Sequence, residues 1–247
     1  MPPENALIVM GKAPRPGSVK TRLCPPLSPR DAADLYACLL ADTAAEMASL
    51  RRVRRYLFID PPEAVDSPQG PRFSGFERHP QRGKDLGERM ANAAEAAFRQ
   101  GAEGVTIVGA DCPALSAGRV SRTFRELGRG AGAVLGPAAD GGFYLIGLSG
   151  PDPRLFRGIE WGGPTVLAGV VDRLKGSGTP FVFLPQERDI DVYEDLVAFR
   201  EWTRRRRCPA CPRTRRWVIS FFAPGGRAVP ARGNGDPPPG SRSRPEG

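Results

Sequence analysis

The feature that most constrains the fold is an apolar run that opens directly into a basic loop near the start of the chain. Residues 6–10 are continuously apolar, as expected of a buried strand, and residues 11–23 contain glycine, proline and four basic side chains. These basic residues are Lys12, Arg15, Lys20 and Arg22. Because glycine permits close backbone approach and cations hold phosphate oxygens, the pattern predicts a phosphate-binding loop, with an ordinary basic surface loop as the alternative.

The spacing within this loop excludes two standard nucleotide-binding motifs. A Walker loop places lysine directly after its last glycine, but Ser18 and Val19 separate Gly17 from Lys20. A dinucleotide-binding fingerprint needs three glycines in the pattern G-x-G-x-x-G, which Gly11 and Gly17 do not supply. The loop would therefore hold phosphates in a third way.

Segments typical of strands and of helices alternate along the first 205 residues. Strands are predicted within residues 6–10, 52–60, 72–77, 105–108, 133–135, 143–146 and 181–184, and helices within 28–50, 85–99, 117–127, 164–174 and 193–205. This alternation predicts one α/β domain over residues 1–205, with a mostly parallel sheet and helices on both faces. Ligands of such sheets bind beyond the carboxyl ends of the strands.

The positive charge of the chain is concentrated near its C-terminus. The net charge is +9, and residues 203–247 contain eleven arginines against only Asp236 and Glu246, so the rest of the chain is balanced. The high charge therefore does not indicate that the body binds nucleic acid, and such contact would come only from the tail. Residues 206–247 are rich in Arg, Pro and Gly and are predicted to be a disordered tail. Cys208 and Cys211 lack a second ligand pair and do not define a zinc site.

Cysteine usage and hydropathy point to a cytoplasmic protein without a membrane segment. Five cysteines at irregular spacings do not predict a disulfide framework. No apolar stretch is long enough for a transmembrane helix, and the first residues lack the basic region of a signal peptide. His79 is the single histidine, so a histidine-centred triad or zinc site is excluded.

Acidic residues follow two of the predicted strands and are candidate metal ligands. Asp111 follows the strand at 105–108, and Asp189 and Asp191 are one residue apart in an extended segment, which places both carboxylates on one side. If that side faces Asp111, three hard oxygen ligands converge, as suits Mg²⁺ or Mn²⁺. The alternative roles are helix caps, by Asp111 for the helix near 117 and by Asp191 for the helix near 193.

Further segments are candidates for binding substrates. Residues 81–87 would recognise a base or ribose, and residues 140–142 form an acidic turn that would meet a sugar hydroxyl or second substrate. Trp161 would line an acceptor pocket. A plain loop, a plain turn and a packed tryptophan are the respective alternatives.

Together these residues describe a metal-assisted substitution at a nucleotide phosphate or at a nucleotide-sugar carbon. The metal would bridge the donor phosphates, and the basic loop would neutralise the departing charge. No residue is an obvious general base, which suits an acceptor that is already ionised.

The motifs resemble the GT-A, or nucleotide-diphospho-sugar transferase, superfamily and, more closely, its bacterial DUF2064 branch of arsenosugar-biosynthesis-type glycosyltransferases and radical-SAM-associated transferases. They lie in order within residues 12–17, 20–23, 85–90, 109–113, 136–148, 159–167 and 189–196. The resemblance covers about residues 5–202 and leaves out the tail. The sequence also resembles the related phospholactate and molybdopterin guanylyltransferases. This resemblance implies that the basic loop binds a nucleoside triphosphate and that the aspartates hold Mg²⁺.

Two departures from the family pattern bear on the reaction. Val192 and Tyr193 stand where the last motif usually continues with Thr-Pro. Only Asp111 stands where glycosyltransferases proper carry Asp-x-Asp, which favours nucleotidyl transfer, whereas the family label favours glycosyl transfer.

We therefore expect a Mg²⁺-dependent transferase that uses a nucleotide sugar and a small-molecule acceptor. Nucleotidyl transfer from a nucleoside triphosphate is the alternative, and a non-catalytic nucleotide- or partner-binding domain is the alternative of another class. The expected catalytic residues are Lys20, Arg22 and Asp111, the metal ligands Asp111, Asp189 and Asp191, and the acceptor residues Asp140, Gly141, Gly142 and Trp161. The expected nucleotide-binding residues are Gly11, Lys12, Arg15, Gly17, Lys20, Arg22, Asp85, Leu86 and Gly87.

Overall fold

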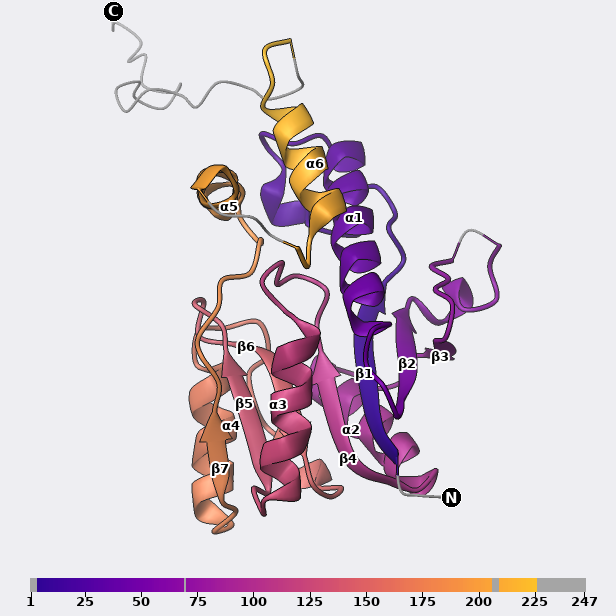
Figure 1. Cartoon of the computed structure of the whole chain (residues 1–247), viewed down its shortest axis with the longest axis vertical. Coiled ribbons are helices and arrows are strands. Elements are labelled where there is room, and N and C mark those ends of the chain that lie inside the picture. Colours follow the sequence, from indigo (N-terminus) through magenta and orange to yellow (C-terminus); the bar gives the residue numbers. More distant parts are fainter. Residues whose placement is uncertain (1–3, 69, 206–208, 226–247) are drawn as a thin grey trace, which may run out of the picture.

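The computed structural model describes residues 4–68, 70–205 and 209–225, which contain one seven-stranded sheet (Figure 1). Its strands are β1 (Glu4–Lys12), β2 (Val53–Asp60), β3 (Glu77–Pro80), β4 (Ala102–Val108), β5 (Ala133–Pro137), β6 (Phe143–Leu148) and β7 (Phe181–Phe183). Their order is β3-β2-β1-β4-β6-β5-β7. Every neighbouring pair is parallel except those of β6, which runs antiparallel to β4 and β5. The predicted α/β class with a mostly parallel sheet is confirmed.

Helices cover both faces of this sheet, as predicted (Figure 1). They are α1 (Pro29–Met47), α2 (Leu86–Arg99), α3 (Ala117–Gly128), α4 (Val166–Gly176), α5 (Tyr193–Arg205) and α6 (Pro212–Phe221). Leu7 and Val9 of β1 pack with α1 and α3, whereas Ala6 and Ile8 pack with α2 and α4. Successive side chains of a strand point to opposite faces, so this one apolar run serves both halves of the core. None of the helices described is both long and apolar enough to cross a membrane.

The chain beyond residue 205 departs from the prediction of a wholly disordered tail. Residues 212–221 form α6, which packs along α1 (Figure 1). Cys211, Thr214, Val218 and Phe221 are buried, and they recur every three or four residues as expected of one helix face. Arginine dominates the exposed side of this helix, which is why the composition suggests disorder. Cys208 and the predicted disorder of residues 226–247 lie outside the described residues.

Asp42 of α1 joins the N-terminus of α6 to the body of the protein. Its carboxylate is 3% exposed and accepts hydrogen bonds from the backbone N–H groups of Arg213 (3.1 Å) and Thr214 (2.7 Å). The guanidinium of Arg213 lies 3.3 Å from the same carboxylate. An acid at this place satisfies N–H groups that a helix leaves unpaired and complements the positive end of its dipole.

We expect Asp42→Ala to lower the free energy of unfolding by about 2 kcal/mol, because buried N–H groups at the start of α6 lose their acceptor. Asp34→Ala is the matched control, since Asp34 lies on the exposed face of the same helix and should change stability by less than about 0.5 kcal/mol. Denaturant unfolding of both variants checks the prediction. Equal stabilities would show that Asp42 does not anchor α6.

Candidate active site

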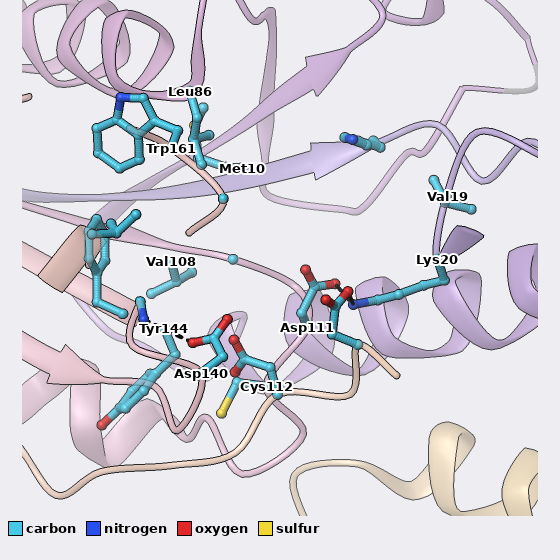
Figure 2. A pocket seen from close by; sticks show the side chains of 18 of the residues that line it. Met10, Val19, Lys20, Leu86, Val108, Asp111, Cys112, Asp140, Tyr144 and Trp161 are labelled. Atoms are coloured by element: carbon cyan, nitrogen blue, oxygen red, sulfur yellow. Dashed lines mark hydrogen bonds and ion pairs between the residues drawn. The ribbon is translucent and has the colours of Figure 1, made fainter. Parts of the chain in front are cut away.

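A cavity of about 500 Å³ opens where the carboxyl ends of β1 and β4 meet. Its walls come from the loop after β1, the start of α2, the segment after β4, the turn between β5 and β6, the loop before α4 and residues 189–191. This is the edge of the sheet at which ligands of α/β proteins bind. In Figure 2, Lys20 and Asp111 lie at one end, and Met10, Leu86 and Trp161 lie at the other.

Two buried residues of the basic loop determine where Lys20 points. Val19 is 3% exposed in the core on the α1 side of the sheet, and Leu23 is fully buried against α1, α5 and α6. Between them Lys20 adopts a left-handed backbone conformation (φ 50°, ψ 36°), which is uncommon for a residue other than glycine. The side chain of Lys20 is 4% exposed, so its ammonium group is held inside the cavity.

The basic loop meets the predicted acids across this end of the cavity. Lys20 Nζ lies 3.0 Å from Asp111 Oδ1 and 3.7 Å from Asp191 Oδ1. The guanidinium of Arg22 pairs with the other carboxylate oxygen of Asp191. Residues that are far apart in sequence therefore form one charged cluster, as the mechanism expected from the sequence requires.

A backbone hydrogen bond fixes the second pair of acids beside Asp111. The N–H of Ile190 donates to the carbonyl of Asp111 (3.0 Å), and the Ile190 side chain is 1% exposed in the cluster formed with α1, α5 and α6. Asp189 and Asp191 flank this anchored residue, so both belong to the cavity wall. The carboxylate of Asp195 receives the N–H groups of Asp191 and Val192, whereas the carboxylate of Asp191 pairs with Lys20 and Arg22.

Four carboxylates converge on this part of the cavity and change the acidity of Asp189. Burial, then the charge of Asp111, raises the pKa of Asp189 from 3.8 to about 7. Lys20 acts in the opposite direction, and Asp140 and Asp191 add to the increase. Asp189 Oδ1 is buried without a hydrogen-bond partner. Such a concentration of negative charge suits the binding of a cation.

The predicted metal ligands are close to one another but do not form a finished metal site. Within the described part of the chain, no group of three His, Cys, Asp or Glu side chains has metal-binding geometry. Asp191 is paired with Arg22, and the ammonium of Lys20 lies between Asp191 and Asp111. Asp111 and the unpartnered oxygen of Asp189 remain as donors of the hard type that Mg²⁺ and Mn²⁺ take.

The residues predicted to bind the nucleotide divide into two groups. Lys12, Lys20, Arg22 and Leu86 line the cavity, whereas Gly11, Arg15, Gly17, Asp85 and Gly87 do not. Leu86 is 44% exposed, which is unusual for leucine and is explained by its place at the mouth of the cavity.

The predicted nucleotide-binding residues that do not line the cavity have structural roles instead. A Cβ atom at Gly11 would lie 3.2 Å from the side chains of Leu40 and Leu57, so this glycine permits close packing of β1. Gly17 has φ +79° and forms a turn. Arg15 pairs with Glu63 at 3.5 Å.

Two residues of the 81–87 segment also serve the fold. The carboxylate of Asp85 accepts from the N–H of Glu88 (2.8 Å) and caps α2. The amide of Gln81 donates to the carbonyls of Gly11 (2.9 Å) and Phe58 (3.0 Å), which ties the end of β3 to β1 and β2. Gln81 also lines the cavity, and base recognition by its side-chain oxygen stays a prediction.

The acidic turn predicted to meet the acceptor lies at the cavity. Asp140 and Gly142 line it, and the carboxylate of Asp140 accepts from the N–H of Gly142 (2.9 Å). Gly141 shapes the turn instead, because its φ is +90° and an added Cβ would lie 2.0 Å from the carbonyl oxygen of Pro164. The carbonyl of Gly141 accepts from Leu167 at 2.9 Å, which fixes the turn to the start of α4.

Trp161 forms part of the opposite wall and packs directly on α2. A Cβ at Gly87 would lie 2.5 Å from the indole ring, and the Phe143 and Phe156 rings lie 6.3 and 6.2 Å from it, centroid to centroid. The indole N–H is buried without a hydrogen-bond partner. This wall is thus aromatic and closely packed, and the indole nitrogen lies against Gly87 of α2.

We expect Gly87→Ala to displace Trp161 and raise the KM of the substrate about tenfold or more, because the new methyl group cannot share the space of the ring. Gly118→Ala in α3 is the matched control, since the nearest atom to its Cβ would be 3.7 Å away and the change should stabilise that helix slightly. Steady-state kinetics of both variants test this. An unchanged KM in Gly87→Ala would place substrate binding away from Trp161.

Several residues that line the cavity receive no individual role from the sequence, although Arg89, Met90, Phe143 and Tyr144 lie within the motifs at residues 85–90 and 136–148. They are Met10, Tyr36, Arg89, Met90, Phe143 and Tyr144. Tyr36 projects from α1 and its hydroxyl accepts from the N–H of Lys12 (2.8 Å), while Arg89 pairs with Asp60 (3.2 Å). Their positions on helix faces and strands look like ordinary core or surface positions until the elements are packed together.

This fold, with its cavity at the strand ends, defines the nucleotide-diphospho-sugar transferase class, and comparison with known proteins agrees. Residues 43–163 match the model of DUF2064, described as an uncharacterized protein conserved in bacteria. A crystal structure from Desulfovibrio desulfuricans, provisionally named a nucleotide-diphospho-sugar transferase, is 30% identical, with 87% of this chain and 97% of that chain covered and a TM-score of 0.74. The chain therefore belongs to the nucleotide-diphospho-sugar transferase family.

More distant solved structures share the fold. A 4-diphosphocytidyl-2C-methyl-D-erythritol synthase is 13% identical over 82% of this chain and 99% of its own, with a TM-score of 0.53. Rv0371c from Mycobacterium tuberculosis is 17% identical over 81% of this chain and 100% of its own, with a TM-score of 0.50. At these identities the likeness concerns the fold alone. No curated protein matches the chain.

Proposed function

We propose that this protein is a divalent-cation-dependent transferase that takes a nucleotide sugar as donor and a small molecule as acceptor. The observation that carries the proposal is the meeting of Lys20 with Asp111 at 3.0 Å, at the carboxyl end of β4. Groups that suit phosphate and groups that suit a cation stand side by side there. A nucleotide diphosphate bound with its metal ion would satisfy both.

Each side chain has a role in this scheme. Asp111 and Asp189 would hold Mg²⁺ or Mn²⁺, with Asp191 joining them when Arg22 and Lys20 turn to the donor phosphates. The bound cation would neutralise the diphosphate that leaves. Lys20, Arg22 and Lys12 would bind the phosphate oxygens, so the chain contributes mainly orientation and electrostatics.

The other end of the cavity would take the sugar and the acceptor. Trp161 and Phe143 present aromatic surface there, and Asp140 adds a carboxylate from the charged end. Aromatic faces and carboxylates are well suited to the apolar faces and hydroxyl groups of sugars. This lining favours glycosyl transfer.

Nucleotidyl transfer from a nucleoside triphosphate is the second candidate, because Asp111 stands alone at the end of β4, with Gly109 and Pro113 two residues away on either side. Glycosyltransferases of this superfamily would be expected to carry a compact pair of acids, Asp-x-Asp, at this position. In this second reaction, attack by an ionised acceptor would not need a general base.

Two parallel assays distinguish these reactions. The full chain is incubated with Mg²⁺ and either a panel of nucleotide sugars, with nucleoside diphosphate release as readout, or a panel of nucleoside triphosphates, with pyrophosphate release as readout. Nucleotide-sugar turnover without pyrophosphate release supports glycosyl transfer, and the reverse supports nucleotidyl transfer. If the wild type carries out neither reaction, and its nucleotide binding persists in Asp111→Asn, the protein is a non-catalytic binding domain.

A further inference from the structure

We propose that Lys20 acts as a built-in cation that occupies the metal-binding position until donor phosphates draw it away. The divalent ion and the donor would then bind cooperatively, and the ion alone would bind weakly. This inference rests on the proposed function, because it concerns the same cation site.

The position of the ammonium group is the first observation. Lys20 Nζ lies within 3.0 Å of Asp111 and 3.7 Å of Asp191, which are two of the predicted metal ligands. With its side chain 4% exposed, Lys20 has little water around it, so its charge is balanced by these carboxylates. A divalent ion that used Asp111 would have to share it with this ammonium, and the two positive charges would repel strongly at such a distance.

The anchoring of the loop is the second observation. Val19 and Leu23 are buried on either side of Lys20 in two different hydrophobic clusters. The backbone is therefore held, while the four-carbon stem of lysine can turn. A short movement of the side chain alone would transfer the ammonium from Asp111 to a phosphate oxygen.

Because Lys20 can pair either with Asp111 or with a donor phosphate, the binding of the divalent ion and the binding of the donor are coupled in both directions. A phosphate that takes the ammonium from Asp111 leaves that carboxylate free for the divalent ion, and the ion in turn frees Lys20 for the phosphate. Coupling between two ligands must be equal in both directions. The unpartnered oxygen of Asp189 stays available throughout, so the site is completed only when the ammonium leaves.

The test is a titration of the nucleotide-free full chain with Mn²⁺ alone, in which electron paramagnetic resonance measures the concentration of free ion. We expect Lys20→Met to bind Mn²⁺ about tenfold or more tightly than the wild type, because the competing charge is gone. Lys20→Arg keeps a cation at this position and should bind as weakly as the wild type. Thermal unfolding of each variant confirms that it is folded.

Lys12→Met separates competition from a general loss of positive charge. Lys12 lines the same cavity but has no ion pair with an acid among the described residues, so its removal should change Mn²⁺ affinity by no more than about threefold. An equal gain in Lys12→Met and Lys20→Met would contradict direct competition.

The remaining outcomes are also decisive. If Lys20→Met binds Mn²⁺ no more tightly than the wild type, while Asp111→Asn loses binding, the metal site stands and the role of Lys20 as its competitor is wrong. If Mn²⁺ binds equally in every variant, including Asp111→Asn, or binds in none, the proposed cation site fails and the inference fails with it.

Discussion

Asp111→Asn is expected to lower turnover by about a hundredfold or more and to leave the fold intact. The substitution removes the one charge that both Lys20 and the proposed divalent ion share, and losses of this size are typical when a group that stabilises transferring phosphates is removed. The fold should persist because the Asp111 side chain is 44% exposed and its backbone carbonyl, which receives the N–H of Ile190, is unchanged.

Asp152→Asn provides the control for this prediction. Asp152 is an aspartate outside the cavity that accepts from the N–H of Arg154 at 3.1 Å, and asparagine can accept the same bond. The turnover of Asp152→Asn should stay within about twofold of the wild type. Turnover is measured under saturating Mg²⁺ with whichever donor the parallel assays identify. A wild-type rate in Asp111→Asn would remove Asp111 from the mechanism.

Asp189→Asn is expected to stabilise the metal-free protein at pH 8, by on the order of 1–3 kcal/mol. The pKa of Asp189 is raised from 3.8 to about 7 by burial and by neighbouring acids, so the native state holds its proton more tightly than the unfolded state. Wild-type stability should therefore fall as the pH rises from about 4 to 7, and the full penalty should be present above 7. Asparagine has no such charge.

Thermal or denaturant unfolding at several pH values checks this effect. The advantage of Asp189→Asn should shrink as the pH falls from 8 towards 4, where the wild-type carboxyl is protonated in the native state. Saturating Mn²⁺ at pH 8 should stabilise the wild type more than the variant, because the ion relieves the same repulsion. A constant difference across this pH range would show that Asp189 does not carry the unfavourable charge.

The fold could be predicted largely from local patterns. The apolar alternation of Leu7 and Val9 with Ala6 and Ile8 specifies a strand buried on both faces, and helical signals follow at regular intervals. The sequence predicts the third strand within residues 72–77, whereas it lies at 77–80, because this four-residue edge strand ends in Pro80 and has little apolar signal of its own.

The C-terminal helix shows where composition misleads. A stripe of residues at positions 211, 214, 218 and 221 faces α1, but the arginines between them dominate a composition average. Residues 218–222, which are mostly apolar, are a local signal that runs against this average. Its burial depends on α1 and on Asp42, which lies about 170 residues earlier in the chain and cannot be paired with it from sequence alone.

The charged half of the site could be predicted because its residues follow strands. Lys20, Asp111 and Asp191 come after strands whose carboxyl ends share one edge of the sheet, and they meet there. In the aromatic and helical half, Trp161 and Leu86 could be predicted, but Tyr36 and Arg89 could not, because they reach the cavity only through the packing of α1 and α2. Such contacts depend on which helix faces which strand, and no single segment encodes that.

The central claim is that the basic loop and the acids share one site for phosphate and metal. Thermal shift of the full chain with a panel of nucleoside diphosphates, with and without Mg²⁺, tests it most directly. We predict that at least one nucleotide raises the melting temperature clearly more when Mg²⁺ is present, and that this increase is lost in both Lys20→Met and Asp111→Asn. Equal shifts with and without Mg²⁺, unchanged in both variants, would contradict it.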